Sequence, residues 1–294
     1  MDKILILLST YNGEQYLRDQ LNSLFNQKGV DITILVRDDG SKDGTIAILK
    51  EYERNTGKVI LIKGENCGSC NSFLKLMEEG LKYCNTYEYF AFCDQDDVWL
   101  EDKLEIAINI LNSRGKKEKP CLYMSAYQMV DKVLKYIKTP TRNPKLSLPS
   151  AFASNCATGC TMVFNTRLLT AVIGYSVKDI IMHDYWTYLM CLASGGFVYY
   201  DSVPHILYRQ HGNNVIGGKG DSFYKKWSIR IKKMFRTGDC FKSKLANQLL
   251  YAKGSIMHSN DRQFLECLST PQKLSSKLYI INNKDFGHVV LIAI

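Results

Sequence analysis

The sequence predicts an α/β fold in which a mainly parallel sheet carries helices on both faces. Apolar runs of strand length, such as residues 4–9 and 87–93, alternate in the N-terminal half with segments whose apolar residues recur at helical spacing. These runs are continuous, which is typical of strands that are buried on both faces. Parallel strands joined by helices account for both observations.

Strands and helices are expected to alternate through the N-terminal part of the chain. The strands cover residues 4–9, 32–36, 59–62 and 87–93. The helix that follows each strand has one apolar stripe, and the four stripes are Leu17, Leu21, Leu24 and Phe25; Ile46, Leu49 and Tyr52; Phe73, Leu74, Met77 and Leu81; and Leu100, Leu104, Ile108 and Leu111.

The order of elements is looser after Pro120. The expected elements are a strand at 123–131, a loop at 139–150, a strand at 159–165, a helix from residue 166 and a second helix at 183–195. Residues 196–214 are expected to form two short strands and a loop, and the tail beyond them to be mostly helical. The fold class is therefore completed by a helical C-terminal extension.

The composition bounds the class of protein. With 294 residues, 46% of them hydrophobic, the chain suffices for one large domain or two small ones. The apolar run at residues 4–8 is too short for the core of a signal peptide, and no run approaches the roughly 20 residues that span a bilayer. We therefore expect a soluble or peripheral cytoplasmic protein.

The ten cysteines are expected to be reduced core residues, because no export signal accompanies them. Cys67 and Cys70 form a CxxC, and Cys156 and Cys160 a CxxxC. The five histidines lie elsewhere in the sequence, which disfavours a structural zinc site at either pair.

Polar clusters follow each of the first four predicted strands, at residues 9–14, 37–45, 64–72 and 94–97. The carboxyl ends of parallel strands meet at one edge of the sheet, and ligands of such sheets bind there. The four clusters are therefore expected to converge on one binding rim.

The last cluster holds Asp94, Asp96 and Asp97 directly after an apolar strand. Asp94 and Asp96 are expected to face the same way across Gln95, a spacing that suits Mg²⁺ or Mn²⁺ bound together with substrate phosphates. The alternative is that Asp94 or Asp97 caps the following helix, which explains one aspartate but not three.

The second cluster contains Asp38 and Asp39, which should point to different sides because they are adjacent. A carboxylate facing the cleft can accept the imide N–H of a pyrimidine base. Ordinary turn chemistry, with Gly40 and Gly44 after aspartates, is the alternative for this segment.

Five motifs in order, "STYNGEQYL", "RDDGSKDGT", "CDQDDVW", "HDYW" and "YRQHGNN", resemble a bacterial family 2 glycosyltransferase of the GT-A fold, in particular its rhamnosyltransferase-like subgroup. The resemblance covers residues 1–217, which we expect to be the catalytic domain. Residues 218–294 match no motif and are expected to form a basic, mainly helical region.

The resemblance implies roles for the nucleotide-sugar site. Residues expected to line the base pocket or approach the donor are Thr10, Tyr11, Asp39 (as partner of the pyrimidine), Asn66, Gly68 and Asn71.

The resemblance also implies a catalytic machinery. Asp94 and Asp96 match the metal-binding DxD, and Asp184 matches the general base at a helix start. His183 stands where the family often has Glu, so the role of that position is open. His211 is implied to contact the metal or the diphosphate, with Arg209 as a cation on the phosphate side.

The chemistry agrees with these residue types. A metal, His211 or Arg209 would stabilise charge on a departing diphosphate, and one carboxylate can deprotonate the acceptor hydroxyl with inversion at the anomeric carbon. The plainer alternatives are that Asp184 caps its helix and that His211 is a loop residue bonded to backbone. Trp99 and Trp186 are expected to be packing residues.

The basic charge is concentrated at residues 219–244, where nine lysines and arginines against two aspartates contribute +7 of the net charge of +9. Apolar residues at 223, 227, 231, 234 and 235 recur there at helical spacing, which suits the surface of an anionic membrane. Packing of this stripe on the catalytic domain is the alternative. Nucleic acid is not expected as a partner, because no reading module accompanies the charge.

The function expected is that of an inverting, metal-dependent glycosyltransferase acting on a cell-surface polysaccharide, O-antigen or capsule precursor. Its expected partners are a nucleoside diphosphate sugar, TDP-rhamnose or a UDP-hexose, and a glycan or lipid-linked glycan acceptor at the inner face of the membrane. A nucleotidyltransferase is disfavoured, because "STYNGEQYL" lacks a glycine- and lysine-rich phosphate loop. A non-catalytic nucleotide-sugar-binding or scaffold module is the alternative from another class.

Overall fold

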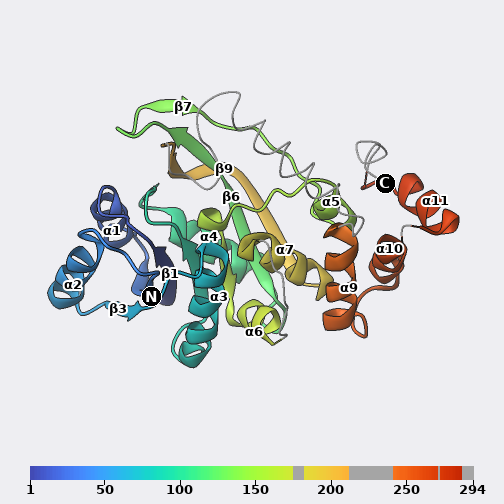
Figure 1. Cartoon of the computed structure of the whole chain (residues 1–294), viewed down its shortest axis with the longest axis horizontal. Helices are drawn as coiled ribbons and strands as arrows, with labels where there is room; N and C mark the ends of the chain where they lie inside the picture. Colours follow the sequence, from blue (N-terminus) through green and yellow to red (C-terminus); the bar gives the residue numbers. More distant parts are fainter. Residues whose placement is uncertain (175–181, 212–240, 271, 287–294) are drawn as a thin grey trace.

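The computed structural model of the chain describes residues 1–174, 182–211, 241–270 and 272–286. One sheet runs through the described part, in the strand order β3-β2-β1-β4-β8-β6-β9-β5, with β7 added to β6 (Figure 1). The strands are β1 Asp2–Thr10, β2 Val30–Asp38, β3 Val59–Lys63, β4 Tyr89–Cys93, β5 Val98–Trp99, β6 Cys121–Val130, β7 Tyr136–Lys138, β8 Val163–Asn165 and β9 Phe197–Arg209.

The first four strands are mutually parallel, as the sequence predicts. β1 pairs in parallel with β2 and β4, and β2 pairs in parallel with β3. β8 is antiparallel to both β4 and β6, whereas β6 and β9 are parallel. The sheet is therefore mixed but mainly parallel, and the carboxyl ends of β1 to β4 share one edge.

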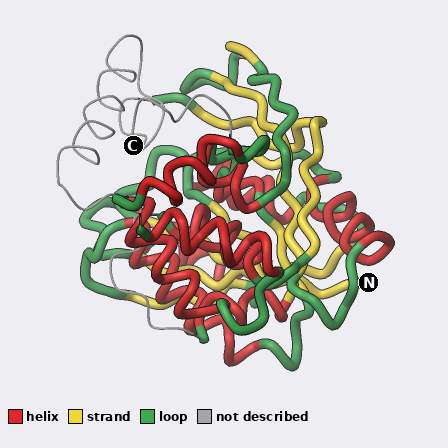
Figure 2. The backbone as a smooth tube through the Cα atoms, turned by 90° about the vertical axis from the view of Figure 1, so that its right-hand side faces the viewer, coloured by secondary structure: helices red, strands yellow, loops and turns green. Residues whose placement is uncertain are grey.

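Helices cover both faces of the sheet (Figures 1 and 2). They are α1 Leu17–Phe25, α2 Thr45–Thr56, α3 Ser69–Gly80, α4 Lys103–Arg114, α5 Leu148–Ala153, α6 Thr166–Ile173, α7 His183–Ala193, α9 Phe241–Lys253, α10 Ser259–Ser269 and α11 Leu274–Asn282, with short 3₁₀ turns η1 Leu81–Tyr83 and η2 Gly159–Thr161.

Side-chain alternation along β1 assigns each helix to a face. Leu5 and Leu7 point into a core shared with α3, α5, α6, α7 and the C-terminal helices. Ile4, Ile6 and Leu8 point to the other face, where they pack with α1, α2 and α4. All five side chains are fully buried, and burial of one such side chain stabilises the fold by about 1.5–3 kcal/mol.

Several expected elements differ in the structure. Residues 196–214 were expected to hold two strands, but β9 is one long strand whose pairing with β6 shifts register near Ala126. Part of the expected loop at 139–150 forms α5, because Ser147 caps it by accepting a hydrogen bond from the Ser150 amide. The first part of the predicted strand 159–165 is the 3₁₀ turn η2. Leu100 lies before α4 rather than in it.

The tail is helical in its described part, as expected. Leu245 of α9, Phe264 of α10 and Ile280 of α11 belong to the same hydrophobic cluster as α3 and α7. The expected domain boundary at 217, most of the basic segment 219–244 and the last apolar residues 288–294 lie outside the described residues. Among the described helices, none combines the length and apolarity that crossing a membrane requires.

Candidate active site

A cavity of about 350 Å³ lies where the four predicted loops meet. Tyr11, Asp39, Gly68 and Asp96 come from the loops after β1, β2, β3 and β4 respectively, and all line it. Asp184 of α7 joins them from the C-terminal half of the sheet. The convergence predicted from the sequence is therefore confirmed.

Asp94 and Asp96 both line the cavity, but the three aspartates have different surroundings. Burial, reinforced by the charges of Asp96 and Asp184, raises the pKa of Asp94 to about 7. Asp97 is fully buried, accepts a hydrogen bond from the Arg209 amide at 3.0 Å, and has a pKa well above the ordinary range, because burial and the neighbouring aspartates disfavour its charge.

The helix-capping alternative for these aspartates is wrong. α4 begins at Lys103 with Asp102 at its N-cap, and no side chain caps it. Asp94, Asp97 and Cys160 instead present possible ligand atoms within 4.8 Å of one another. The sequence contains no spacing that could have singled out Cys160, because it arrives from η2.

Asp96 is joined to His211. The Nε2 atom of His211 lies 2.7 Å from Oδ2 of Asp96, and the imidazole packs against the Tyr16 ring with centroids 4.8 Å apart. His211 is therefore not a loop residue held only by backbone. It lies beside Asp96 of the acidic motif, and its implied contact with a metal or a diphosphate stays a prediction.

Arg209 occupies a structural position. Its guanidinium is 2% exposed and donates to the Asp96 carbonyl at 2.9 Å, to the Lys132 carbonyl at 2.7 Å and to Asp19 at 2.9 Å. It also lies over the Tyr16 ring. Arg209 is not among the cavity-lining residues, so its contacts hold the loop that carries Asp96.

Asp184 lines the cavity from the first turn of α7 and is 5% exposed. Its Oδ2 accepts from the Gly159 amide at 3.1 Å and its Oδ1 from the Tyr185 amide at 2.7 Å. Burial raises the pKa of Asp184 to about 6, although these hydrogen bonds oppose the rise. A carboxylate with this pKa is largely ionised at neutral pH and can still take up a proton.

His183, whose role the sequence left open, is 8% exposed, packs in the core and also lines the cavity beside Asp184. Its ring stacks on Phe73 with centroids 3.9 Å apart and meets Phe92 edge-on. Burial lowers the pKa of His183 to about 3, so the ring is neutral. A β-carbon at Gly159 would lie only 3.0 Å from Nε2 of His183, which explains a glycine at this close approach.

Asp38 and Asp39 diverge, as expected of adjacent residues. Asp38 accepts from Thr10 at 3.0 Å and from the Gly40 amide at 3.2 Å, within the fold. Asp39 lines the cavity and forms an ion pair with buried Arg37.

Asp39 also orders the loop before α3. It accepts from the amides of Cys67 and Gly68, each with one contact at 3.0 Å. Burial alone would raise its pKa, but the hydrogen bonds from Arg37, Cys67 and Gly68 hold it below the ordinary value. Asp39 is therefore an anion at the cavity wall. Gly68, whose amide donates to it, has a φ of +83°, a backbone conformation that favours glycine.

The remaining residues that were predicted to contact the nucleotide-sugar divide into two groups. Tyr11 and Asn66 line the cavity, whereas Thr10 is buried against Asp38 and Asn71 is exposed with its amide on the Cys67 carbonyl. Sequence reasoning missed Gln95, whose side chain binds both backbone groups of Tyr11 at 2.8 and 3.1 Å.

Other expectations concern residues near the site. Trp99 and Trp186 are 2% and 1% exposed, so both are packing residues, as predicted. The nine cysteines that the structure describes are free thiols. Five of them are buried, as expected of core residues, but Cys67, Cys70, Cys84 and Cys267 are only partly buried.

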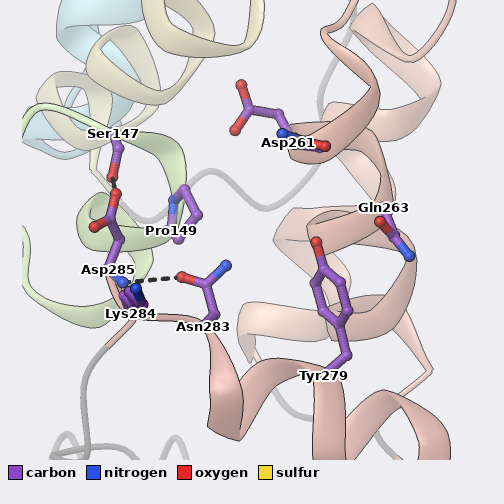
Figure 3. Close-up of a pocket in the computed structure, with 9 residues that line it drawn as sticks. Ser147, Pro149, Asp261, Gln263, Tyr279, Asn283, Lys284 and Asp285 are labelled. Carbon is purple, nitrogen blue, oxygen red and sulfur yellow. Dashed lines mark hydrogen bonds between the residues drawn. The ribbon is translucent and has the colours of Figure 1, made fainter.

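A second cavity, of about 530 Å³, lies between α5, α10 and α11 (Figure 3). Although larger, it is the weaker candidate for a catalytic site. Asp285 on its wall already accepts hydrogen bonds from Ser147 at 2.7 Å and from Lys145 at 3.2 Å. None of the four converging loops lines this cavity. Asp261 on its wall has a pKa raised by burial.

Comparisons with known proteins agree with this site. Residues 5–118 match the model of glycosyl transferase family 2. A dTDP-rhamnosyl transferase RfbG of Shigella flexneri is 29% identical over 246 residues, covering 78% of this chain and 81% of that protein. A putative teichuronic acid biosynthesis glycosyltransferase TuaG of Bacillus subtilis is 26% identical over 226 residues, covering 76% and 85%.

Solved structures share the fold at low sequence identity. S. aureus TarS 1-349 in complex with UDP-GlcNAc superposes with a TM-score of 0.55 at 16% identity, covering 99% of this chain and 82% of that one. The mannosyltransferase PcManGT of Pyrobaculum calidifontis, in complex with GDP-Man and Mn²⁺, has a TM-score of 0.53 at 15% identity, covering 99% and 74%. Residues 5–118, which hold the first four strands and the loops after them, therefore match glycosyl transferase family 2, and the sequence relatives and the GT-A-like fold agree with that match.

Proposed function

We propose that this glycosyltransferase moves a sugar from a nucleoside diphosphate to a surface polysaccharide precursor with inversion, using a divalent cation. The observation that carries the proposal is one cavity lined both by the Asp94–Asp96 pair, with His211 bound to Asp96, and by Asp184. TDP-rhamnose is the first donor to test, because a dTDP-rhamnosyl transferase is among the relatives. The teichuronic acid relative supports a polysaccharide product.

The residues fit a divalent cation. Asp94 and Asp96 offer the hard oxygen ligands that Mn²⁺ and Mg²⁺ prefer, and His211 offers a nitrogen beside them. Among the described residues, no lysine or arginine side chain forms an ion pair with Asp94 or Asp97. A bound cation would neutralise charge on the leaving diphosphate.

The protein's own groups supply the remaining steps. Asp184, fixed by two backbone amides, accepts the proton of the acceptor hydroxyl as that oxygen attacks the anomeric carbon. Tyr11, held by Gln95, and the loop ordered by Asp39 form the walls on which the nucleotide is held. Asp39 is the candidate partner of a pyrimidine imide.

The test is calorimetric titration of the protein with UDP, TDP, GDP and CDP, each with and without Mn²⁺. We expect tight, metal-dependent binding of TDP or UDP that is lost in Asp96→Ala. Absence of metal-dependent binding for every nucleotide would leave the acidic motif with a structural role and contradict the proposal.

A non-catalytic binding module is separated by a second measurement. Transfer of the sugar from the bound donor to water or to an acceptor releases nucleoside diphosphate. This release should be measurable in wild type and lost in Asp184→Asn. No release by wild type with every donor that binds would favour the binding module, whereas equal release by both proteins would mean that Asp184 is not the base.

A further inference from the structure

The hairpin between β6 and β7 carries an unusual surface. All the side chains of residues 132–138 are exposed. Four of them are apolar, with exposed fractions of 71% for Val133, 36% for Leu134, 56% for Tyr136 and 48% for Ile137. Three lysines at 132, 135 and 138 alternate with them. We call residues 132–138 the hairpin tip.

The hairpin tip is an ordered turn. Oδ1 of Asp131 accepts from the amides of Val133 and Lys135, both at 2.9 Å. The backbone closes with hydrogen bonds between Asp131 and Lys135 at 2.9 Å and from Leu134 to Asp131 at 3.0 Å. The backbone that carries the exposed apolar side chains is therefore held in place.

Backbone geometry does not account for the apolar residue at the turn. Leu134 has a φ of +66°, a conformation that favours glycine or asparagine over leucine. A leucine there is both strained and exposed in the folded chain. A surface that covers this side chain would remove its apolar area from water, and that gain would offset the cost of the backbone conformation.

We propose that the hairpin tip docks on the surface of an anionic phospholipid bilayer. Aromatic and aliphatic side chains insert at the boundary between headgroups and acyl chains, while lysines between them contact the anionic headgroups. No ion pair within the described ranges involves the three lysines, so their charge is available for headgroups. A second copy of the same tip would meet it with like charge.

Hydrogen bonds connect the hairpin to the loop that carries Asp96 at the cavity. Arg209 donates from one guanidinium to both the Lys132 carbonyl and the Asp96 carbonyl, at 2.7 and 2.9 Å. The Gln210 amide adds a bond to the Val130 carbonyl at 2.8 Å. Docking of the tip would therefore orient the cavity relative to the bilayer. For the proposed function, on which this consequence rests, the cavity would then face an acceptor carried on lipid.

Figure 1 shows β7 at the upper edge of the molecule, remote from α9, α10 and α11. This separation allows a matched control. The test variant is Val133→Ser, Tyr136→Ser and Ile137→Ser combined. The control is Tyr251→Ser, Ile256→Ser and Leu274→Ser combined, which removes side chains of 85%, 66% and 72% exposure from the helical tail.

The experiment is sedimentation of the full chain with vesicles of phosphatidylcholine, with and without phosphatidylglycerol. Wild type and control should bind the anionic vesicles, whereas the test variant should lose more than about tenfold in partitioning. A variant with Lys132, Lys135 and Lys138 changed to Gln should lose about a hundredfold, since each lysine near such a surface contributes about fivefold. Added salt should weaken wild-type binding.

Three results would overturn the proposal. In the first, wild type does not bind anionic vesicles. In the second, the hairpin variants bind as tightly as wild type does, which would assign the binding to another segment. Alternatively, the hairpin variant could change the sedimentation coefficient without vesicles, which would identify the tip as a contact between copies. Calorimetry of TDP with Mn²⁺ on the same variants separates this inference from the proposed function, because the substitutions leave the backbone bonds to Arg209 in place.

Discussion

His211 and Asp96 lie 115 positions apart in the chain, yet Nε2 of one is 2.7 Å from Oδ2 of the other. This contact joins the end of β9 to the loop after β4, at the edge of the cavity. A carboxylate oxygen and an imidazole nitrogen this close together can both bind one divalent cation.

The pair should act together in nucleotide binding. We expect Asp96→Asn and His211→Ala each to weaken Mn²⁺-dependent nucleotide binding by more than about tenfold, and the double variant to lose less than the sum of the two free energies, because each variant disrupts the same site. Titration calorimetry measures the cycle.

The chain contains a matched control for this cycle. Asp102 and His205 form a second aspartate–histidine pair, at 3.1 Å, that does not line the cavity. Asp102→Asn should leave nucleotide binding unchanged. Strict additivity of the Asp96 and His211 variants would mean that they do not share a ligand.

Asp184 should be required for transfer but not for donor binding. Asp184→Asn keeps the shape of the side chain and removes the proton acceptor, so we expect kcat to fall by about 10²–10⁴ with the dissociation constant of the donor within about twofold. Asp201→Asn is the control, since Asp201 is also hydrogen-bonded, to Tyr123 at 3.1 Å, and lies outside the cavity. Weakened donor binding with an unchanged turnover rate would argue against a base.

Asp184 should also make the transfer rate fall at acid pH. The raised pKa of Asp184, about 6, means that protonation removes the base as pH falls through 6. The transfer rate at saturating donor should therefore decrease toward acid, about tenfold per pH unit well below this value. A rate profile that stays flat from neutral pH to well below 6 would be inconsistent with Asp184 as the base.

The acidic cluster should make the metal-free protein less stable as pH rises. The folded-state pKa of Asp94 is raised to about 7 from an ordinary value of 3.8, so the folded state binds more protons than the unfolded state between these values. The free energy of unfolding should fall across that window by about 1.4 kcal/mol per pH unit for this group.

Mn²⁺ should reverse that loss. Binding to the folded state raises Tm, and the rise should be larger at pH 8 than at pH 5, because the ligands are then deprotonated. Thermal melts of the metal-free protein, and of Asp94→Asn as the control, measure this. An equal shift of wild type and Asp94→Asn would assign the effect to other sites.

Arg209 should stabilise the site through geometry rather than charge alone. Arg209→Lys keeps the charge but cannot reproduce donation to the Asp96 and Lys132 carbonyls and to Asp19. We expect it to lower the free energy of unfolding by about 2–4 kcal/mol, as measured with denaturant, and to weaken metal-dependent binding. Full retention of both by Arg209→Lys would instead favour a simple cation facing the phosphates.

Much of the fold and the identity of the acidic motif were predictable from the sequence. Apolar runs and helical stripes determine β1 to β4 and their helices locally, and parallel pairing then brings the four loops to one edge. α5 replaces the end of the loop predicted at 139–150, because serine at an N-cap followed by proline in the first turn starts a helix.

Other features depended on contacts between distant segments. Burial, which raises the pKa of Asp184 and lowers that of His183, arises from packing of α7 on Phe73 and η2, and no local pattern encodes it. The guanidinium of Arg209 was expected among phosphates but is enclosed by carbonyls from two other loops.

The sequence by itself thus determined the parallel sheet, the rim at which its four loops meet and the aspartates at that rim, because strand periodicity and strand-end polarity are local properties of the chain. Only the tertiary structure decided which rim residues line the cavity, which ones support it from behind, and that the hairpin tip stays exposed. Those outcomes depend on burial and on hydrogen-bond partners more than a hundred positions away, which exist only once the sheet has assembled.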